Sequence, residues 1–458
     1  MERGIDVLLA GRNPDYAHKP CQTTVARIDH QEQCKLLVAV IGAGYVGLVT
    51  AAGLAANGHR VRVGESDPAR RAMLRSGTVP FHEAGLSRIV NEGIDNNLLT
   101  FHGDNHEAID GAAVVVIALP TPPAGDGSAD LSIIEAALKG FGPALVPGTV
   151  VALKSTVPVG SVKRFQKLID DVGGQATVVS NPEFLREGSA VTDFFHPDRV
   201  VIGSNDQAAA ETLMAMYESI QAPVVVTRPE SSELIKYASN AYLATRIAFA
   251  NAIANVCEAV GADVDEVTKG MGYDRRIGFH FFHPGPGYGG SCFPKDTRAL
   301  VATSADAGYD FSLLRGVIES NDMQLDRMID KIRAAKPDLD GAHIGLWGLA
   351  FKAGTDDLRE SPALKIAVAL ADLGAHVVAF DPAVSSVDDD RIQIADDPVA
   401  AAQGADVLVV ATEWAEFAGV GLRSVRSAMA GSTIVDVRNL LDPIAVRQLG
   451  MTYVGVGH

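Results

Sequence analysis

The stretch from Gly285 to Asp296, GPGYGGSCFPKD, carries a single cysteine, Cys292, in a loop rich in glycine. Thiolate is the reactive form of cysteine, and a cation (Lys295) and a carboxylate (Asp296) lie close to Cys292 in the sequence. A structural cysteine usually lies in an apolar run, whereas this one has glycines, a proline and charges as neighbours. The pattern therefore favours a covalent nucleophile over a buried structural thiol.

Length and composition limit what kind of protein can carry this loop. A chain of 458 residues is too long for one core and predicts two or three domains. No apolar run approaches the roughly 18 residues of a spanning helix, so we expect a soluble protein without membrane partners. Four cysteines are too few for a disulfide framework, and the N-terminus lacks a secretory pattern, which favours the cytoplasm. A net charge of -17 argues against nucleic acid as a partner.

A dinucleotide-binding motif begins at Lys35. The apolar run KLLVAVIGAG leads into a G-x-G-x-x-G turn from Gly42 to Gly47, and a helical stretch of small residues follows. About twenty residues beyond the turn, Glu65 ends a second predicted strand, where a carboxylate can bond the ribose hydroxyls and repel a 2'-phosphate. The alternative is a glycine-rich turn with no ligand, but strand, turn, helix and acid in this order favour an NAD site.

Further strands are predicted at 111–123 and 148–160, and they end at Thr121 and Thr156. Ligands of doubly wound sheets bind beyond the carboxyl ends of the strands, so we expect both threonines at the cofactor crevice. The next predicted strand, within 176–190, ends in a loop with Glu183, Arg186 and Glu187. The residues alone leave open whether this loop is functional or merely solvated.

From about Ser231 the pattern becomes helical. Residues 231–261 predict one long Ala-rich helix, opened by serines that can cap it, and this helix is either a spine between domains or a dimer interface. Its asparagines 240, 251 and 255 share one sector with Lys236, which favours a buried polar lining over a solvated face. Two more amphipathic segments complete a helical middle domain that ends near Pro337.

The last third repeats the first in outline: HIGLWGLAFK, LADLGAHVVAFDP and ADVLVVATEW parallel the three strands of the first third. We therefore predict a second Rossmann-like sheet, which lacks the full G-x-G-x-x-G and is not expected to hold a second NAD. Lys352, Arg359 and Arg438 lie at predicted strand ends, where phosphates would bind. The predicted fold is α/β, with two Rossmann-like doubly wound parallel-sheet domains joined by a long central helix and a helical middle domain. The expected division is an N-terminal extension that is poorly ordered (1–35), an NAD-binding domain (36–228), a helical central domain (229–336) and a C-terminal Rossmann-like domain that could hold another nucleotide (337–458).

A set of motifs carries a family resemblance. GAGYVG, KSTVPVG, NPEFLREGSA, ELIKYASNAYLA, DRRIG, GYGGSCFPKD and GLAFK followed by DDLRESPA occur in order. From about residue 36 to the end, the chain resembles the UDP-glucose/GDP-mannose dehydrogenase family, and within it the branch that oxidises UDP-glucose. The resemblance implies NAD as cofactor, a UDP-sugar substrate, a homodimer or higher homo-oligomer, and four-electron oxidation of UDP-glucose to UDP-glucuronate through a cysteine thiohemiacetal and thioester.

The resemblance also implies roles for individual residues. The residues matched to catalysis are Cys292, Lys236, Asn240, Asp296, Thr156 and Glu187. Those matched to NAD are Gly42, Gly44, Tyr45, Val46, Gly47, Glu65, Arg70, Thr121, Thr156, Glu187, Lys295 and Arg359. Those matched to substrate are Glu183, Phe184, Leu185, Arg186, Glu187, Lys236, Asn240, Phe281, Phe282, His283, Pro284, Gly285, Gly289, Phe351, Lys352 and Arg438, with Arg276 reaching across the dimer. No metal site is predicted, and which group acts as base at each step stays open.

Two departures from the family pattern keep alternatives in view. The chain has Leu119-Pro120-Thr121-Pro122 where a V-G-T-P-like turn is common, and its N-terminal extension has no family counterpart. Glu65 also stands where the family usually has Asp. One alternative is a dehydrogenase of another nucleotide sugar, such as GDP-mannose or a UDP-N-acetylhexosamine. The other is a catalytically weak nucleotide-sugar binder.

Overall fold

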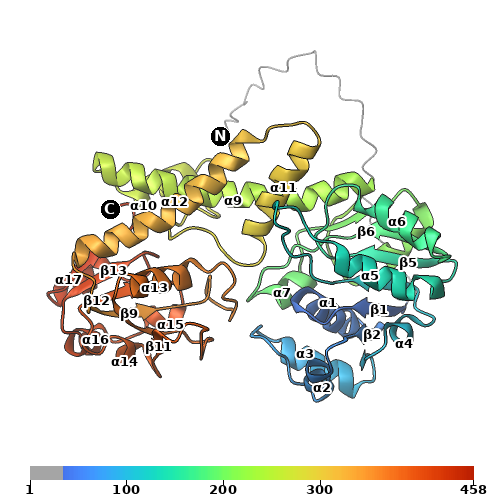
Figure 1. Ribbon diagram of the computed structural model, residues 1–458, viewed down its shortest axis with the longest axis horizontal. Helices are drawn as coiled ribbons and strands as arrows, with labels where there is room; N and C mark the ends of the chain where they lie inside the picture. Colours follow the sequence, from blue (N-terminus) through green and yellow to red (C-terminus); the bar gives the residue numbers. More distant parts are fainter. Residues whose placement is uncertain (1–34) are drawn as a thin grey trace, which may run out of the picture.

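A computed structural model describes residues 35–458 and shows two α/β lobes joined by long helices (Figure 1). Except for Lys35, the extension expected at the N-terminus lies outside the described residues. One lobe is built on the first half of the chain and the other on the last quarter, so the predicted pair of sheet domains is confirmed.

The N-terminal lobe contains an eight-stranded sheet with the order β3-β2-β1-β4-β5-β6-β7-β8. Its strands are β1 (Leu37–Ile41), β2 (Arg60–Gly64), β3 (Leu99–His102), β4 (Val114–Ile117), β5 (Thr149–Leu153), β6 (Ala176–Ser180), β7 (Val200–Gly203) and β8 (Val224–Thr227). The first six are parallel, whereas β7 pairs antiparallel with β6. Runs of β-branched residues such as VVVI in β4 are fully buried because helices cover both faces of the sheet.

Helices on the two faces of this sheet form two separate cores. One core packs against α1 (Tyr45–Ala56), α3 (Leu86–Asp95), α7 (Ala190–Phe195) and α8 (Gln207–Met216). The other packs against α4 (Asn105–Ile109), α5 (Ser132–Phe141) and α6 (Ser161–Asp171). The short helices α2 (Pro68–Arg75) and η1 (Gly142–Ala144) lie in the connections. This arrangement is the doubly wound layering that the sequence predicts.

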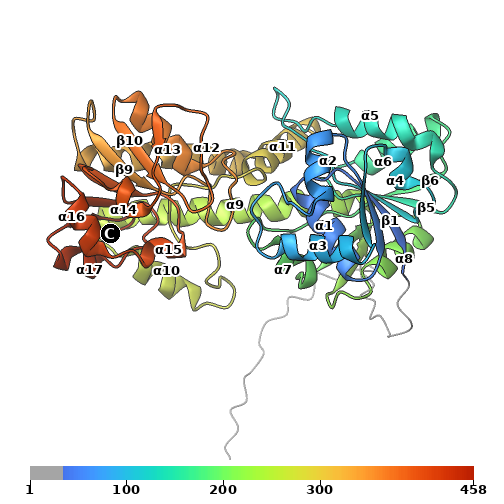
Figure 2. The same ribbon diagram turned by 90° about the horizontal axis from the view of Figure 1, so that it is seen from below.

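The middle of the chain is helical, with α9 (Pro229–Val260), α10 (Val264–Gly272), α11 (Phe293–Asp306) and α12 (Ser312–Ala335). Figure 2 shows α9 running from one lobe to the other. The predicted serine cap is wrong: α9 begins at Pro229, and Ser232 lies inside its first turn, where its hydroxyl meets that of Ser180 at 2.8 Å. Proline suits the first helical position because it has no backbone N–H to leave unpaired there.

The buried face of α9 carries the predicted polar side chains among small apolar ones. Lys236, Asn240 and Asn251 are almost fully buried, and Asn255 donates to Gln324 of α12 at 2.9 Å. Among residues 35–458, α9 is the helix long and apolar enough to cross a membrane, with a mean hydropathy of 1.2 in its most apolar window. α9 packs against α11 and α12. A core helix of a folded protein can have the same length and hydropathy.

The C-terminal lobe contains a parallel six-stranded sheet with the order β11-β10-β9-β12-β13-β14. Its strands are β9 (His343–Trp347), β10 (His376–Phe380), β11 (Ile392–Ile394), β12 (Val407–Val410), β13 (Thr433–Asp436) and β14 (Thr452–Val454). Its helices are α13 (Pro362–Asp372), α14 (Pro398–Ala401), α15 (Ala415–Ala418), α16 (Leu422–Ala428) and α17 (Pro443–Gln448). The order matches that of the first six strands of the N-terminal sheet, which confirms the predicted pseudo-repeat.

Candidate active site

A cavity of about 720 Å³ lies where the two lobes and the central helix α9 meet. Its lining includes the loop after β6, the middle of α9, the loop that ends at Cys292, and loops of the C-terminal lobe after β9, β12 and β13. The predicted site residues in its lining are Glu183, Phe184, Leu185, Arg186, Glu187, Lys236, Asn240, Phe281, His283, Gly289, Cys292, Phe351, Lys352 and Arg438. Residues from both sheets and from the middle domain therefore face one space.

Cys292 lies immediately before α11, which begins at Phe293. The glycines before it allow a close approach to the C-terminal lobe: Gly290 has φ +80°, and a side chain there would lie 2.8 Å from the Phe351 ring. Burial raises the pKa of the Cys292 thiol to about 11, while the charge of Lys236 opposes that rise. The cation acting on the thiol is thus Lys236, and the sequence neighbour Lys295 instead pairs with Asp296.

Lys236 and Glu183 form a buried ion pair beside Cys292. The Lys236 ammonium donates to the Glu183 carboxylate at 2.8 Å, and the two side chains are only 3% and 6% exposed. Burial alone lowers the pKa of Lys236, but the charges of Glu183, Cys292 and Asp296 outweigh burial and raise it. Lys236 is therefore a fixed cation at neutral pH, suited to stabilising a negative oxygen beside the thiol.

Asp296 is fully buried one turn into α11. Asn240 donates to one of its oxygens at 2.7 Å, and Lys295 donates to the other at 2.6 Å. The long helix α9 places Asn240 one turn beyond Lys236, so both side chains point toward the start of α11. The structure thus brings together Cys292, Lys236, Asn240 and Asp296.

Glu187 lies at the contact between the loop after β6, the cysteine loop and the C-terminal lobe. Its carboxylate accepts from Ser291 at 3.2 Å and from Thr355 at 3.4 Å, and Arg359 lies 3.5 Å away. Burial, together with the nearby charge of Asp357, raises the pKa of Glu187 to about 7. A carboxyl group that titrates near neutral pH beside Cys292 is suited to proton transfer.

The turn after β1 has the form of a dinucleotide cradle. Gly42 has φ +102°, and a side chain on it would lie 2.6 Å from the Ala118 carbonyl, whereas a side chain on Gly44 would meet nothing within 4 Å. α1 then begins at Tyr45 with no side chain capping its first amides, which leaves them free for a phosphate. Glu65 comes directly after β2 and accepts from the Ala43 amide at 3.3 Å. The residues present therefore fit a dinucleotide.

Several other predicted cofactor residues belong to the N-terminal lobe, whereas Lys295 pairs with Asp296 of α11 and Arg359 lies in the C-terminal lobe. Thr121 donates to the Thr156 carbonyl at 3.1 Å, so the ends of β4 and β5 meet as expected. Val46 and Gly47 lie in the first turn of α1, and Arg70 lies exposed in α2. Pro120 is exposed at the end of β4.

Cations from the C-terminal lobe face the cavity. Arg438 donates to the carbonyls of Phe351 and Ala411, each at 3.0 Å, and lies 3.2 Å from Glu413. Burial lowers the pKa of Lys352, which lines the same wall. Two partly buried cations, one after β9 and one after β13, are suited to a diphosphate.

Some predicted substrate residues lie outside the cavity lining. Phe282, Pro284 and Gly285 lie beside it, and Gly285 is bonded to Asn251 and Gln324 through its backbone. Arg276 is exposed and pairs with Asp274, away from the cavity. In contrast, Arg199 went unpredicted, although its guanidinium stacks 3.6 Å from the centre of the Phe184 ring. Periodicity and motif spacing carry no signal for such a contact.

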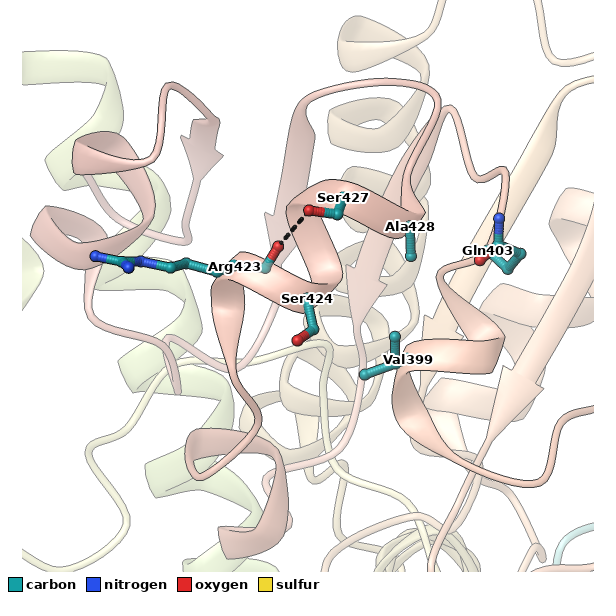
Figure 3. A pocket seen from close by; sticks show the side chains of 6 residues that line it. All are labelled: Val399, Gln403, Arg423, Ser424, Ser427 and Ala428. Carbon is teal, nitrogen blue, oxygen red and sulfur yellow. Dashed lines mark hydrogen bonds between the residues drawn. The ribbon is translucent and has the colours of Figure 1, made fainter.

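A second hollow of about 470 Å³ lies on the C-terminal lobe, between α14 and α16 (Figure 3). Arg423, Ser424 and Ser427 of α16 face it together with Gln403. None of the predicted site residues lies there, and the Ser427 hydroxyl is already bonded to the Arg423 carbonyl at 2.9 Å.

Comparison with known proteins agrees with this geometry. Models of one family match the chain in three parts: its NAD binding domain at residues 36–221, its central domain at 230–323 and its UDP binding domain at 345–443. The chain belongs to the UDP-glucose/GDP-mannose dehydrogenase family. As a family member it is an NAD-dependent oxidoreductase, and the cradle after β1 falls within the part that matches the NAD binding domain.

Several members of the UDP-glucose/GDP-mannose dehydrogenase family are similar over nearly their full length. The chain is 43% identical over 438 residues to UDP-glucose 6-dehydrogenase of Pseudomonas aeruginosa, covering 91% of this chain and 96% of that protein. It is also 43% identical over 434 residues to UDP-glucose 6-dehydrogenase of Rhizobium meliloti, with 92% and 99% covered. A UDP-glucose dehydrogenase structure from Pyrobaculum islandicum has a TM-score of 0.86 at 35% identity, with 94% of this chain and 100% of that chain covered.

Proposed function

We propose that this protein catalyses the NAD-dependent four-electron oxidation of UDP-glucose to UDP-glucuronate. The observation that carries the proposal is that Cys292, the fixed cation Lys236 and the phosphate-suited Lys352 line one cavity. The similarity to proteins named UDP-glucose 6-dehydrogenase supports the choice of sugar.

The residues divide between two ligands. Gly42, Gly44 and Glu65 would hold NAD in the N-terminal lobe, and Lys352 and Arg438 would hold the UDP moiety from the C-terminal lobe. NAD, when bound, accepts a hydride in each of the two oxidations. The sugar's reacting carbon would then lie between the lobes, next to Cys292.

Cys292 would keep the aldehyde on the protein between the two oxidations. Its sulfur bonds to the aldehyde carbon while the thiol proton passes to the aldehyde oxygen, which gives a thiohemiacetal. Loss of a hydride and a proton converts this group to a thioester, and water then releases the acid and restores the thiol. Lys236 and Asn240 lie where they would stabilise the oxygen that gains negative charge.

Of the carboxylates near Cys292, Glu187 is the one placed to move protons in these steps. Glu187 titrates near pH 7 and lies next to Ser291, whereas Glu183 is held in its ion pair with Lys236. Asp296 has both oxygens occupied, which suits it to positioning Asn240 and Lys295. We therefore assign proton transfer to Glu187. Asp296 is assigned the role of holding Asn240 and Lys295 in place.

We also propose that the protein is a homodimer in the cytoplasm. Tyr242, Phe249, Val256 and Val260 of α9 are all large, apolar and about half exposed or more, and they recur at spacings of seven, seven and four. Such a row on one helix face predicts a partner helix. Arg276, free of the cavity in its own chain, would then be available to a partner's site.

Oxidation of another nucleotide sugar is the second candidate. The chain is similar to a UDP-D-ManNAc dehydrogenase structure from Pyrococcus horikoshii, with a TM-score of 0.82 at 28% identity over 92% of this chain and 99% of that chain. Because the phosphate-facing cations would be shared, the two candidates differ only in the sugar.

A substrate panel tests the proposal. The protein is incubated with NAD and UDP-glucose, GDP-mannose or UDP-N-acetylglucosamine, and both NADH and sugar acid are quantified. We expect UDP-glucose to give the highest kcat/KM, with two NADH released per acid. A higher kcat/KM for another sugar would reassign the substrate, and binding without NADH formation would leave only a nucleotide-sugar binder.

A further inference from the structure

The segment Phe81–Ala84, in the connection between α2 and α3, contacts three separate parts of the molecule. The Phe81 ring packs on the Tyr45 ring, with 4.9 Å between their centres. The His82 amide donates to Asp356 of the C-terminal lobe at 3.1 Å. None of the proposed catalytic steps uses this segment, although it lies between the cofactor cradle and the cavity.

Glu83 is the buried centre of this segment, with 7% of its surface exposed. One of its oxygens accepts from the Gly188 amide at 2.7 Å and from the Tyr45 hydroxyl, and the other accepts from the Val191 amide at 3.4 Å. Within residues 35–458 no lysine, arginine or histidine forms an ion pair with Glu83. A buried carboxylate satisfied only by neutral donors is costly to keep, and it binds those donors strongly.

Tyr45 brings the cofactor cradle into this network. It is the first residue of α1, directly after Gly44, and its hydroxyl also accepts from the Gly188 amide at 3.0 Å. Burial, together with the hydrogen bond to Glu83, raises the pKa of Tyr45. The hydroxyl therefore stays protonated and donates a hydrogen bond to Glu83. These hydrogen bonds therefore link the first turn of α1 to Gly188.

Gly188 brings in the catalytic loop and the other lobe. It comes directly after Glu187, the carboxylate beside Ser291. A side chain on Gly188 would lie 2.7 Å from the Gly354 carbonyl, so the two backbones pack in direct contact. The path from Gly44 to Tyr45, Glu83, Gly188 and Glu187 is thus continuous from the dinucleotide cradle to the cavity.

We infer that Glu83 is a positioning residue that couples occupancy of the dinucleotide cradle to the loop 183–189, and through that loop to Glu187. The inference rests on the proposed function for its purpose: the cofactor must be exchanged between two oxidations while the sugar stays bound. A link from the cradle to Glu187 lets the loop tighten when NAD enters and loosen when NADH leaves. Glu83 itself is not among the residues that line the cavity.

Hydrogen exchange of the full chain, with and without saturating NADH, tests this coupling. In wild type we expect NADH to slow exchange in residues 184–195 by at least about tenfold. In Glu83→Ala that protection should fall to less than about threefold, while residues 42–47 remain protected by NADH. Glu83→Gln keeps an acceptor for Gly188 and should restore most of the protection.

A matched control separates coupling from loss of a buried acid. Glu233 is also buried, at 2% exposed, and accepts from the amides of Gly160 and Val162 at 2.6 and 2.8 Å. Glu233→Ala should lower stability comparably and yet leave the NADH protection of residues 184–195 intact. If Glu83→Ala does not fold, Tyr45→Phe, which removes one hydroxyl, should weaken the same protection.

Kinetics provides the second readout. With UDP-glucose, Glu83→Ala should lower kcat about tenfold while the KM for NAD changes less than about threefold, and Glu83→Gln should recover most of kcat. Undiminished protection of residues 184–195 in both Glu83→Ala and Tyr45→Phe overturns the inference. Failure of the proposed function is a different result, because then no nucleotide sugar yields NADH while the exchange experiment, which needs no sugar, still reports on the coupling.

Discussion

The N-terminal and C-terminal sheets share one strand order and differ in the segment that connects the first strand to the first helix. After β1 the chain turns over residues 42–44 and enters α1 at once, whereas after β9 it runs through residues 348–361 before α13 begins. The acidic residue after the second strand sits at the same place in both, as Glu65 and as Asp381. Topology alone therefore does not decide which sheet binds a dinucleotide.

Asp381 has different hydrogen-bond partners from Glu65. One of its oxygens accepts from the amides of Leu349 and Ala350 at 2.8 and 3.0 Å, and from the Trp414 indole at 3.1 Å. In the C-terminal sheet two successive loop amides and an indole are thus bonded to one carboxylate oxygen. In the N-terminal sheet Glu65 accepts from Ala43 and Asp67, and the first amides of α1 stay free.

The largest expected effect is the loss of this internal anion. Asp381→Ala leaves several buried donors without an acceptor, and we expect it to lower the free energy of unfolding by about 3 kcal/mol or more. Glu65→Ala is the matched control, and it should cost no more than about 1 kcal/mol because Glu65 has fewer partners and one of them, Asp67, is exposed. Denaturant unfolding of both variants measures the difference, and equal losses would mean that the two acids play the same part.

Loss of a cation from the long loop after β9 comes next. Lys352→Ala should raise the KM for UDP-glucose by roughly thirtyfold, or about 2 kcal/mol, because a charge-assisted phosphate contact is removed. The KM for NAD should change less than about twofold, since the dinucleotide cradle lies in the other lobe. Steady-state kinetics with each substrate varied in turn checks this, and a shift confined to NAD would contradict the division between sheets.

Cofactor choice tests the other sheet. Because Glu65 would oppose a 2'-phosphate, we expect kcat/KM for NAD to exceed that for NADP by at least about tenfold, or about 1.4 kcal/mol. Glu65→Gln should reduce this preference without altering the KM for UDP-glucose. Equal use of the two cofactors by wild type would remove Glu65 from the ribose site.

A pH dependence of stability is expected as well. Glu187 has its pKa raised in the folded protein from an ordinary value of 4.5 to about 7. The folded state therefore holds a proton that the unfolded chain releases, so this contribution to stability is present below pH 4.5 and is lost as the pH rises through about 7. Glu187→Gln should lose less stability than wild type between about pH 5 and about pH 8, measured by thermal unfolding across that range. If stability depended on pH in the same way in both proteins, a group other than Glu187 would be responsible for that dependence.

Much of the fold is predictable from local patterns. The continuous apolar runs of β1, β4 and β5 and the turn at Gly42 are visible in the sequence because burial on both faces demands them. The direction of β7 is not visible, because a four-residue apolar run reads the same in either orientation. The predicted cap of α9 is wrong because serines and Pro229 both signal a helix start, and the structure uses the proline.

The sequence predicts which residue types make up the site, but it does not predict which side chains pair with one another. Sequence neighbours suggest Lys295 as the cation for Cys292, whereas α9 delivers Lys236 from fifty-six positions earlier, and Lys236 pairs with Glu183 from another loop. Such pairings depend on how α9 crosses both lobes, which no local pattern encodes. The coupling through Glu83 is of the same kind, since Tyr45, Glu83 and Gly188 meet only in the folded chain.

The two sheets, in this account, place a sugar and a cofactor on either side of Cys292. The most direct measurement is therefore the number of NADH released per UDP-glucuronate, in wild type and in Cys292→Ser. We predict two NADH per acid in wild type, and a stalled second oxidation or hydrolysis in Cys292→Ser, which should still fold and bind NADH because serine matches cysteine in shape but is a far weaker nucleophile. A Cys292→Ser protein that released two NADH per acid at the wild-type rate would contradict the covalent mechanism.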